Sequence, residues 1–305
     1  MLRSWVALGL AASSLLLSSS SRADELVRIV RMKISAGDVA SGEAAIEDYK
    51  RKTGVDTEYL NALGWLARGA ELLRRPEKAA ALVALLHREI PKENAEYLVP
   101  YGAAIEVEGR LIAAREGRGA AIRFWTDEQT RAKDVSLQSR IRKNINLVSL
   151  EGQPAPEIGY AQRAGSASGR LAELRGKPAL LFIWAAGCGD CKAQGPTVER
   201  IMKAYGPRGL TLVAPTRLYG PGKDGKPATP AEEKQEIEKA WAETFPGLAG
   251  SAVPIDTDTM VRYGGSATPT FVLVDRRGIV RLYAPTRLSE AELSRRIDEV
   301  LNETP

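Results

Sequence analysis

Residues 178–196 read PALLFIWAAGCGDCKAQGP and join an apolar run to a pair of cysteines. The run Pro178–Trp184 is short, uninterrupted and rich in large apolar side chains, which favours a buried strand. Cys188 and Cys191 follow at once, and a helical pattern continues from them to Tyr205, where a Gly-Pro dipeptide ends it. The sequence therefore predicts a strand-to-helix junction with both thiols at the start of the helix.

Cys188 and Cys191 are the only cysteines in the chain, so three roles compete for them. As a staple, a disulfide that closes four residues would add roughly 2 kcal/mol, less than a longer bridge. As zinc ligands, the pair and the only histidine, His87, would still need carboxylates, and we expect no catalytic role for His87. As a redox pair, the first sulfur meets unsatisfied N–H groups that favour its thiolate, and the second lies close enough to attack a mixed disulfide. The pattern favours the redox role.

The rest of the C-terminal half alternates short apolar runs with helical ones. The sequence Gly152-Gln153-Pro154-Ala155-Pro156 is rich in turn residues and predicts a linker before this half. Beyond it we expect the order β-α-β-α-β-α-β-β-α, an α/β layer fold with helices on both faces of the sheet. The expected strands are 178–184, 210–214, 253–256, 270–275 and 279–283, and the expected helices are 188–205, 230–245, 257–263 and one capped by Ser289.

Residues 24–149 have the apolar spacing of helices almost throughout. The stretches RRPEKAAAL and REGRGAAIRF share a basic end, a turn and an Ala-rich helix start, a weak sign of tetratricopeptide-like hairpins without a strict period. We expect an all-α helical-hairpin domain, and a peptide-binding groove is the less favoured addition. Within it we expect a helix from Pro76 to Pro91, one from Asn94 to Glu116 interrupted at Pro100, a turn at 117–119, a short piece ending at Trp125, and a helix from Asp127 to Asn146.

Residues 1–23 resemble a secretory signal peptide. Arg3 supplies a positive start, Trp5–Leu17 is apolar, and Ser21-Arg22-Ala23 ends in a small-x-small pattern. An uncleaved anchor is less favoured, because 13 helical residues span only about 20 Å of a roughly 30 Å hydrocarbon core. We expect an exported protein of the periplasm or cell envelope without stable membrane insertion. The 43 basic and 38 acidic residues are nearly balanced on both sides of residue 150, so nothing suggests a nucleic-acid partner.

Three stretches now carry a family resemblance: GQPAPEIG at 152–159, LRGKPALLFIWAAGCGDC at 174–191 and RYGGSATPTFVLVDRRGIV at 262–280. Together they resemble the thioredoxin fold, and within it the TlpA/ResA-like exported thiol–disulfide oxidoreductases. Pro196 in the helix after the cysteines also matches. The resemblance covers about residues 150–303 and predicts a thioredoxin-like domain over 150–305, and the helical half lies outside it.

The resemblance implies a set of site residues. Cys188 would be the exposed attacking cysteine and Cys191 the buried resolving one. Pro269 would be a cis-proline facing the disulfide, and Thr268 before it would pair its backbone with a substrate peptide. Trp184 before the motif would join Thr268 in binding substrate.

This sequence also departs from the family pattern. Gly187 stands where members often carry an aromatic residue, Gln194 where many carry a glutamate, and Phe182 where thioredoxin has a buried aspartate. The usual proton acceptors for Cys191 are therefore missing. Asp190 is the nearest carboxylate, and we favour a role for it in capping the helix over a role in proton transfer.

A long polar segment, TRLYGPGKDGKPAT at 216–229, follows the second expected strand. In open α/β sheets this end of the strand lies on the active-site side. The segment is either a solvated insertion, which we favour, or a substrate lid that uses Arg217 and Tyr219.

These observations predict an exported thiol–disulfide oxidoreductase that acts on protein thiols and disulfides without a metal or organic cofactor. The negative charge of Asp190 between the cysteines opposes a thiolate, which favours a reductant. The resemblance implies a membrane thiol transporter as electron donor. The alternative is an interaction module whose helical domain recruits a partner while the thioredoxin fold only docks it. A thiol peroxidase is disfavoured because its Thr-x-x-Cys pattern is absent.

Overall fold

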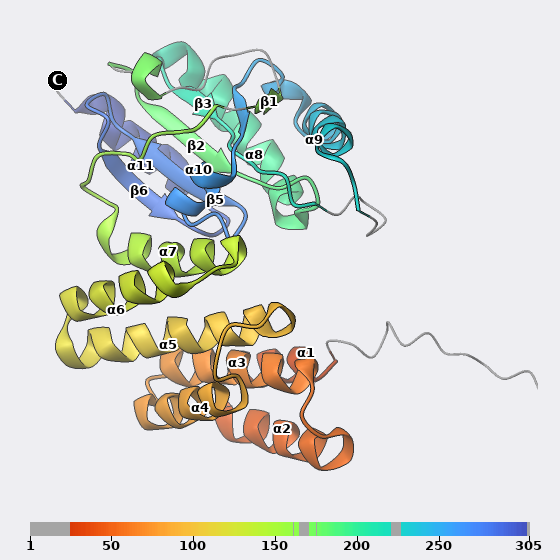
Figure 1. Cartoon of the computed structure of the whole chain (residues 1–305). Coiled ribbons are helices and arrows are strands. Elements are labelled where there is room, and N and C mark those ends of the chain that lie inside the picture. Colours follow the sequence, from red (N-terminus) through yellow and green to blue (C-terminus); the bar gives the residue numbers. More distant parts are fainter. Residues whose placement is uncertain (1–24, 161, 165–170, 175, 221–226, 304–305) are drawn as a thin grey trace, which may run out of the picture.

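The computed structural model describes residues 25–160, 162–164, 171–174, 176–220 and 227–303. Figure 1 shows a helical half, coloured red to yellow-green, and a sheet-containing half, coloured green to blue. The signal segment expected at 1–23 lies outside the described residues. Within the described ranges, no helix is both long and apolar enough to cross a membrane.

Seven α-helices and one 3-10 turn build the described helical half. Their starts follow from local chemistry: Asp38, Asp56 and Asp134 cap helices with their side chains, and Pro76 occupies a first position, where no N–H is needed. The elements are α1 (Glu25–Ser35), α2 (Val39–Thr53), α3 (Thr57–Leu72), α4 (Pro76–Glu89), η2 (Ala95–Tyr97), α5 (Leu98–Glu116), α6 (Arg118–Arg131) and α7 (Val135–Ser149).

Some expected helix boundaries were wrong. Pro100 does not interrupt a helix, because it is the third residue of α5, where the N–H groups lack intrahelical acceptors anyway. The expected turn at 117–119 shrinks to Gly117, whose φ of 89° ends α5, and α6 starts at once. The single helix expected over 127–146 is two, because Asp134 accepts hydrogen bonds from the N–H groups that start α7.

The helical half has two apolar clusters, one shared by α1 to α5 and one by α5 to α7. In the second cluster, Trp125 donates its indole N–H to Ile105 O at 3.0 Å. Its ring lies against Gly109, where a Cβ atom would come within 2.1 Å of the indole. Glycine at this position therefore lets α5 and α6 pack closely.

The second half contains a four-stranded sheet in the order β3-β2-β5-β6. β2 runs parallel to β3, and β5 runs antiparallel to both of its neighbours. The strands are β1 (Gln162–Ala164), β2 (Ala179–Ile183), β3 (Thr211–Val213), β4 (Val253–Ile255), β5 (Thr270–Val274) and β6 (Val280–Ala284). The helices are η3 (Leu171–Leu174), α8 (Gly189–Tyr205), η4 (Gly206–Arg208), α9 (Pro230–Thr244), η5 (Pro246–Leu248), α10 (Thr257–Arg262) and α11 (Glu290–Asn302).

The expected α/β order is confirmed, with one strand added. β1 was not predicted from the sequence, and it pairs with β4 in a separate two-stranded sheet. Beside the main sheet, Val213 of β3 forms an isolated parallel bridge with Ala252, just before β4, and Thr216 forms one with Ile255 of β4. Alternate residues of β2 face opposite sides: Leu180 and Phe182 meet α8, α9 and α11, whereas Leu181 and Ile183 meet α10 and residues 150–158.

The expected linker at 152–156 is instead part of the sheet edge. Gly152 N donates to Val280 O at 2.8 Å, Val280 N donates to Gln153 O at 2.9 Å, and Ala155 N donates to Gly278 O at 2.8 Å. The segment therefore pairs its backbone with β6 and with the turn before it, through an isolated bridge rather than a regular strand.

α7 is the helix on which the two halves meet (Figure 1). Ser139 Oγ donates to Met260 O at 3.1 Å, and Asn146 Nδ2 donates to Arg262 O at 3.0 Å. Gly264 lies so close to the Lys143 backbone that a Cβ would meet it at 2.5 Å. The segment that precedes Thr268 therefore rests directly on α7.

Candidate active site

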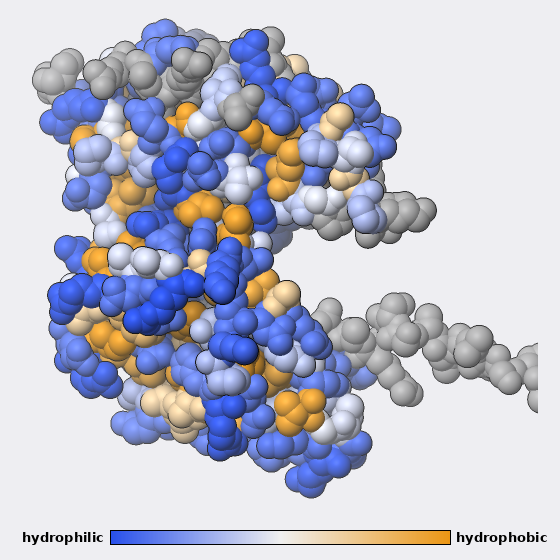
Figure 2. Space-filling model, in the orientation of Figure 1, coloured by the Kyte–Doolittle hydropathy of each residue, from blue (hydrophilic) through white to orange (hydrophobic). Residues whose placement is uncertain are grey.

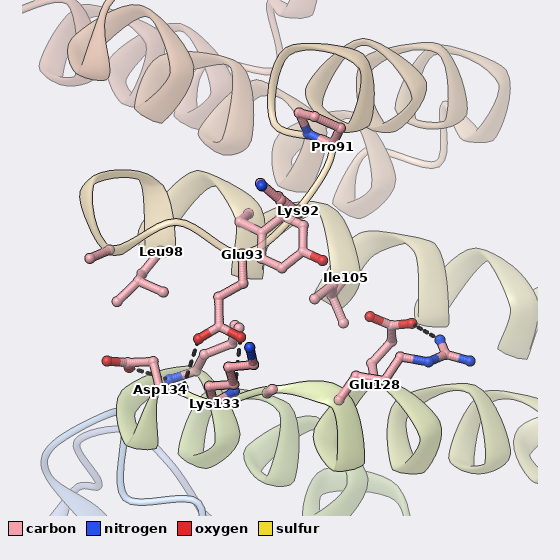
Figure 3. A pocket seen from close by; sticks show the side chains of 13 residues that line it. Pro91, Lys92, Glu93, Leu98, Ile105, Glu128, Lys133 and Asp134 are labelled. Atoms are coloured by element: carbon pink, nitrogen blue, oxygen red, sulfur yellow. Dashed lines mark hydrogen bonds and ion pairs between the residues drawn. The ribbon is translucent and has the colours of Figure 1, made fainter.

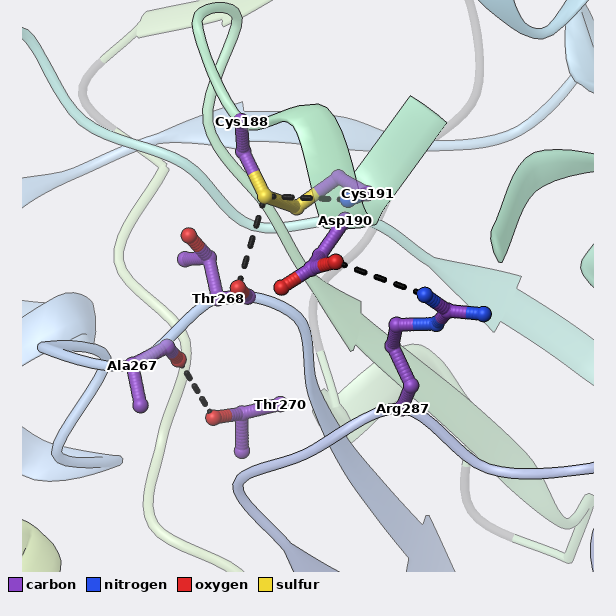
Figure 4. The surroundings of a disulfide bond; sticks show 7 residues. All are labelled: Cys188, Asp190, Cys191, Ala267, Thr268, Thr270 and Arg287. Atoms are coloured by element: carbon purple, nitrogen blue, oxygen red, sulfur yellow. Dashed lines mark hydrogen bonds and ion pairs between the residues drawn. A yellow bond between two sulfur atoms is a disulfide. The ribbon is translucent and has the colours of Figure 1, made fainter. Parts of the chain in front are cut away.

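The two cysteines lie where β2 gives way to α8, as the sequence predicted (Figure 4). They form a disulfide with Cα atoms 5.2 Å apart. Cys188 is half-buried and caps α8, because its Sγ accepts a hydrogen bond from Cys191 N at 3.0 Å. Cys191 is fully buried. The more accessible cysteine is thus the one whose sulfur faces the N–H groups of the helix start.

A second segment faces the disulfide from the start of β5. The Thr268–Pro269 peptide bond is cis, as expected, and Thr268 O lies 3.4 Å from Cys188 Sγ. Thr270 Oγ1 donates to Ala267 O at 2.7 Å and ties this turn together. Thr268 is half-buried, so its backbone is near both the sulfur and solvent.

Asp190 lies in the first turn of α8, where its carboxylate suits the helix dipole as expected, although it is not the N-cap residue itself. The N-cap is Cys188, and the Asp190 carboxylate lies 3.5 Å from Arg287 on the segment before α11. Both side chains are exposed, at 65% for Asp190 and 57% for Arg287. Arg287 is a site residue that the sequence alone did not indicate, since it lies almost 100 residues from the cysteines.

Gln194 holds the same segment in place. Its side chain, only 3% exposed, donates from Nε2 to Leu288 O at 2.8 Å and accepts from Leu288 N at 3.2 Å. An amide makes both bonds at once, whereas a carboxylate could only accept. The residue that replaces the family's glutamate therefore fixes the loop that carries Arg287.

Trp184 is not placed to bind substrate. It is 1% exposed, and its indole N–H is donated to Ala214 O at 3.1 Å. Its ring lies 5.0 Å from Trp241 and 5.5 Å from Phe245, measured between centroids. The sequence-based assignment is wrong because the side chain faces into the core beneath the disulfide.

No described carboxylate is positioned to serve Cys191 as a buried proton acceptor. The buried acidic residues of the described chain are Glu106, Glu233 and Asp275. Glu106 pairs with cations of the helical half, Glu233 accepts from backbone N–H groups after β3, and Asp275 accepts from the β5–β6 turn. Phe182 fills the wall instead, 5.4 Å from Phe271 and 5.6 Å from Phe245 between ring centroids.

The described part of the polar segment after β3 is anchored, which argues against a simple solvated insertion. Glu233 accepts hydrogen bonds from Tyr219 N and Gly220 N. The Arg217 guanidinium lies 4.4 Å from the Tyr219 ring centroid and donates to Ser136 Oγ of α7 at 3.1 Å. Residues 221–226 of this segment lie outside the described residues, so the alternative of a substrate lid stays a prediction.

Comparisons with known proteins agree with this geometry. No family model matches the chain. The Thioredoxin-like protein YneN of Bacillus subtilis is 26% identical over 164 residues, which cover 53% of this chain and 85% of that protein. The thiol-disulfide oxidoreductase ResA of Geobacillus thermodenitrificans is 24% identical over 150 residues, covering 49% of this chain and 77% of that protein.

Solved structures also align with about half of the chain. A thioredoxin-like superfamily protein matches with 23% identity and a TM-score of 0.42, covering 50% of this chain and 97% of that one. A thiol-disulfide isomerase from Corynebacterium glutamicum matches with 17% identity and a TM-score of 0.41, covering 49% and 98%. Over about half of its length, this chain is therefore similar in sequence to thioredoxin-like thiol–disulfide oxidoreductases, and the sheet of that half has the mixed order β3-β2-β5-β6 expected of a thioredoxin-like fold.

Proposed function

We propose that this protein is an exported reductant of protein disulfides, acting through Cys188 and Cys191. The observation that carries the proposal is the position of Cys188 Sγ, which accepts the Cys191 N–H at 3.0 Å and faces Thr268 O at 3.4 Å. The N–H groups of a helix start stabilise a thiolate, and a thiolate is the attacking species in disulfide exchange. Thr268 offers a backbone carbonyl beside it for a substrate peptide.

The reaction balances with the disulfide seen here as its product. The Cys188 thiolate attacks one sulfur of a substrate disulfide, a mixed disulfide forms, and the other substrate sulfur leaves as a thiolate. Cys191 then loses its proton and attacks Cys188 Sγ, which forms the intramolecular disulfide and releases the second substrate thiolate. Two electrons pass to the substrate. One released thiolate takes the proton that Cys191 loses, and the other takes a proton from solvent.

The resolving step needs a proton acceptor that is not a buried carboxylate. Cys191 is fully buried among apolar side chains, which disfavours its thiolate. The leaving substrate thiolate is the base closest to the reacting sulfurs in the mixed disulfide. We therefore assign it the proton of Cys191, which couples release of the substrate to resolution.

The direction of electron flow rests on the charges beside Cys188. Asp190 disfavours the thiolate and thereby the dithiol form, as in a reductant, but Arg287 at 3.5 Å offsets part of its charge. A reductant in an oxidising compartment needs an outside donor of two electrons. We propose a membrane dithiol transporter for that role, with the protein in the periplasm or cell envelope.

Alkylation and insulin reduction test the proposal. In the reduced protein, Cys188 should react with iodoacetamide before Cys191, because Cys188 is partly accessible and faces the N–H groups of the helix start, whereas Cys191 is fully buried. Cys188→Ser should abolish insulin reduction, and Cys191→Ser should accumulate mixed disulfides. Equal alkylation of both thiols, or insulin reduction by Cys188→Ser, would refute the assigned roles.

A further inference from the structure

A cavity lies in the helical half, away from the disulfide. It has a volume of about 580 Å³, within the range of ligand pockets. It lies between the connection that follows α4, the first turns of α5, and the turn from α6 into α7 (Figure 3). Its apolar wall is made by Leu98, Tyr101, Ile105, Ala132 and Leu137.

The carboxylate of Glu93 connects two of the segments that surround this cavity. Glu93 accepts hydrogen bonds from Lys133 N at 2.8 Å and from Asp134 N at 2.7 Å, which ties the α4–α5 connection to the start of α7. Figure 3 shows the Glu93 side chain reaching across to that turn. Asp134 itself caps α7. The cavity is thus bounded by backbone that two long-range hydrogen bonds to Glu93 hold in place.

Among the charged side chains that line the cavity, the ones without a partner in the described structure are cations. The lining holds three acidic and three basic residues, so the formal charges cancel. However, Glu93 and Asp134 are occupied by backbone N–H groups, and Glu128 pairs with Arg131 at 2.5 Å. Lys92 and Lys133 are exposed, and no ion pair holds either ammonium group in the described structure. A ligand therefore meets an apolar wall with two ammonium groups at its rim.

The cavity belongs to the same helix that supports the active site. Ser136, between the lining residues Asp134 and Leu137, accepts the hydrogen bond from Arg217 after β3. Gly264, four residues before Thr268, packs closely against the backbone of Lys143 on α7. Seven helical residues separate Ser136 from Lys143, about 10 Å of rise. Figure 2 shows the outline indented between the two halves, with hydrophobic residues on both sides of the indentation.

We propose that this cavity binds an apolar side chain of the protein substrate, with a neighbouring carboxylate paired to Lys92 and Lys133. The proposal rests on the proposed function, since the bound segment belongs to the protein whose disulfide is reduced. The apolar wall selects Leu-like side chains, and the two ammonium groups select acidic flanks. Docking on α7 then raises the local concentration of the substrate disulfide at Cys188.

The test uses the full chain and two disulfide-containing peptides. One carries an Asp-Leu-Glu segment and the other a Lys-Leu-Lys segment, each with a fluorescent label. The cavity variant is Lys92→Glu with Lys133→Glu, and the matched control is Lys177→Glu with Lys203→Glu, which makes the same charge change at exposed positions elsewhere. Leu98→Gln alters the apolar wall without changing charge.

The wild-type protein should bind the acidic peptide at least about tenfold more tightly than the basic one. The cavity variant and Leu98→Gln should weaken binding of the acidic peptide about tenfold and raise KM for its reduction, with kcat preserved. The control should stay within about twofold. Reduction of hydroxyethyl disulfide, which is too small to reach the cavity, should be equal in all variants.

Two failures are distinguishable. If the acidic peptide binds the wild type and the cavity variant equally, the docking inference is overturned while the redox function stands. If the wild type fails to reduce hydroxyethyl disulfide, the proposed function fails. Fluorescence anisotropy of the labelled peptides, which measures binding alone, still decides whether the cavity binds the acidic peptide. Thermal unfolding of each variant confirms that the comparison is between folded proteins.

Discussion

Single residues set the chemistry of the disulfide, and Asp190 and Arg287 form a charge pair beside it whose members can be substituted separately (Figure 4). Their side chains pair at 3.5 Å but remain more than half exposed. Asp190→Asn should leave Arg287 unopposed, favour the thiolate of Cys188 and raise the reduction potential. Arg287→Gln should lower it. Each shift should be on the order of 10–20 mV because the pair is solvent-screened.

Equilibration with glutathione measures these potentials, and the double variant serves as the internal control. It should return close to the wild-type value, since both charges are then absent. Shifts in the same direction for the two single variants would show that the charges do not act through Cys188.

Gln194 permits a second test at the residue scale. Gln194→Glu keeps the acceptor for Leu288 N but places a carboxylate oxygen against Leu288 O, so the buried acid should be held protonated. An acid whose pKa is higher in the folded state than in the unfolded state lowers the free energy of unfolding least at a pH below the unfolded pKa. The destabilisation grows as the pH rises above that value. The loss in the free energy of unfolding relative to wild type should therefore be small at pH 4 and about 1–3 kcal/mol at pH 7.

Urea unfolding at both pH values measures this loss. Gln235→Glu, an exposed position on α9, is the matched control and should show little change at either pH. A loss for Gln194→Glu that does not depend on pH would mean that the amide pairing is not what the substitution breaks.

At the scale of elements, a buried charge cluster joins α3, α5 and α7. Glu106, with a side chain only 5% exposed, pairs with Arg110 at 2.9 Å, Arg68 at 3.2 Å and Lys143 at 3.5 Å. Burial alone raises the pKa of Glu106, but the surrounding cations outweigh it and lower the pKa to about 2. A depressed pKa contributes stability above the unfolded value near 4.5 that is lost as the pH falls towards 2.

Glu106→Gln should therefore cost about 3 kcal/mol at pH 7, because it leaves three cations without their shared partner. The difference from wild type should shrink as the pH falls from 4.5 towards 2.5. Chemical denaturation across this range measures it, with the exposed Glu47→Gln as control. Parallel pH profiles for wild type and Glu106→Gln would contradict the role of the cluster.

Elements were predictable from the sequence where one local signal dominated, and not where distant contacts decided. The apolar run before Cys188 and the Ser289 cap gave β2, α8 and α11 correctly. The break at Asp134 was missed because no glycine or proline marks it, and β1 was missed because its three residues become a strand only by pairing with β4. Likewise, the cysteine pair is evident from its spacing, but Arg287 and the burial of Trp184 depend on the assembled fold.

At the scale of the whole molecule, α7 is packed against both halves, so the proposed boundary near residue 150 can be tested by shortening the chain. A chain beginning at Leu150 should fold cooperatively and reduce a small disulfide. A chain beginning at Asp134 should be more stable by about 2 kcal/mol, because Ser139 and Asn146 then still donate to the carbonyls of Met260 and Arg262.

Thermal and urea unfolding of the two shortened chains measure the difference, with the full chain for comparison. Absence of a cooperative transition in the shorter chain would place the boundary before α7 rather than after it. Equal stabilities would show that α7 contributes only to the helical half.

The pairing of residues 152–155 with β6 has a consequence for solubility. β6 is an outer strand of the sheet, and a bare outer strand presents unpaired N–H and C=O groups that another copy can join. Here Gly152, Gln153 and Ala155 pair with backbone groups of β6 and of the turn before it, while Ala252, just before β4, bridges to β3 at the opposite border. The segment that follows α7 therefore acts as a built-in guard against intermolecular strand addition, and removing it should favour aggregation even where the active site remains intact.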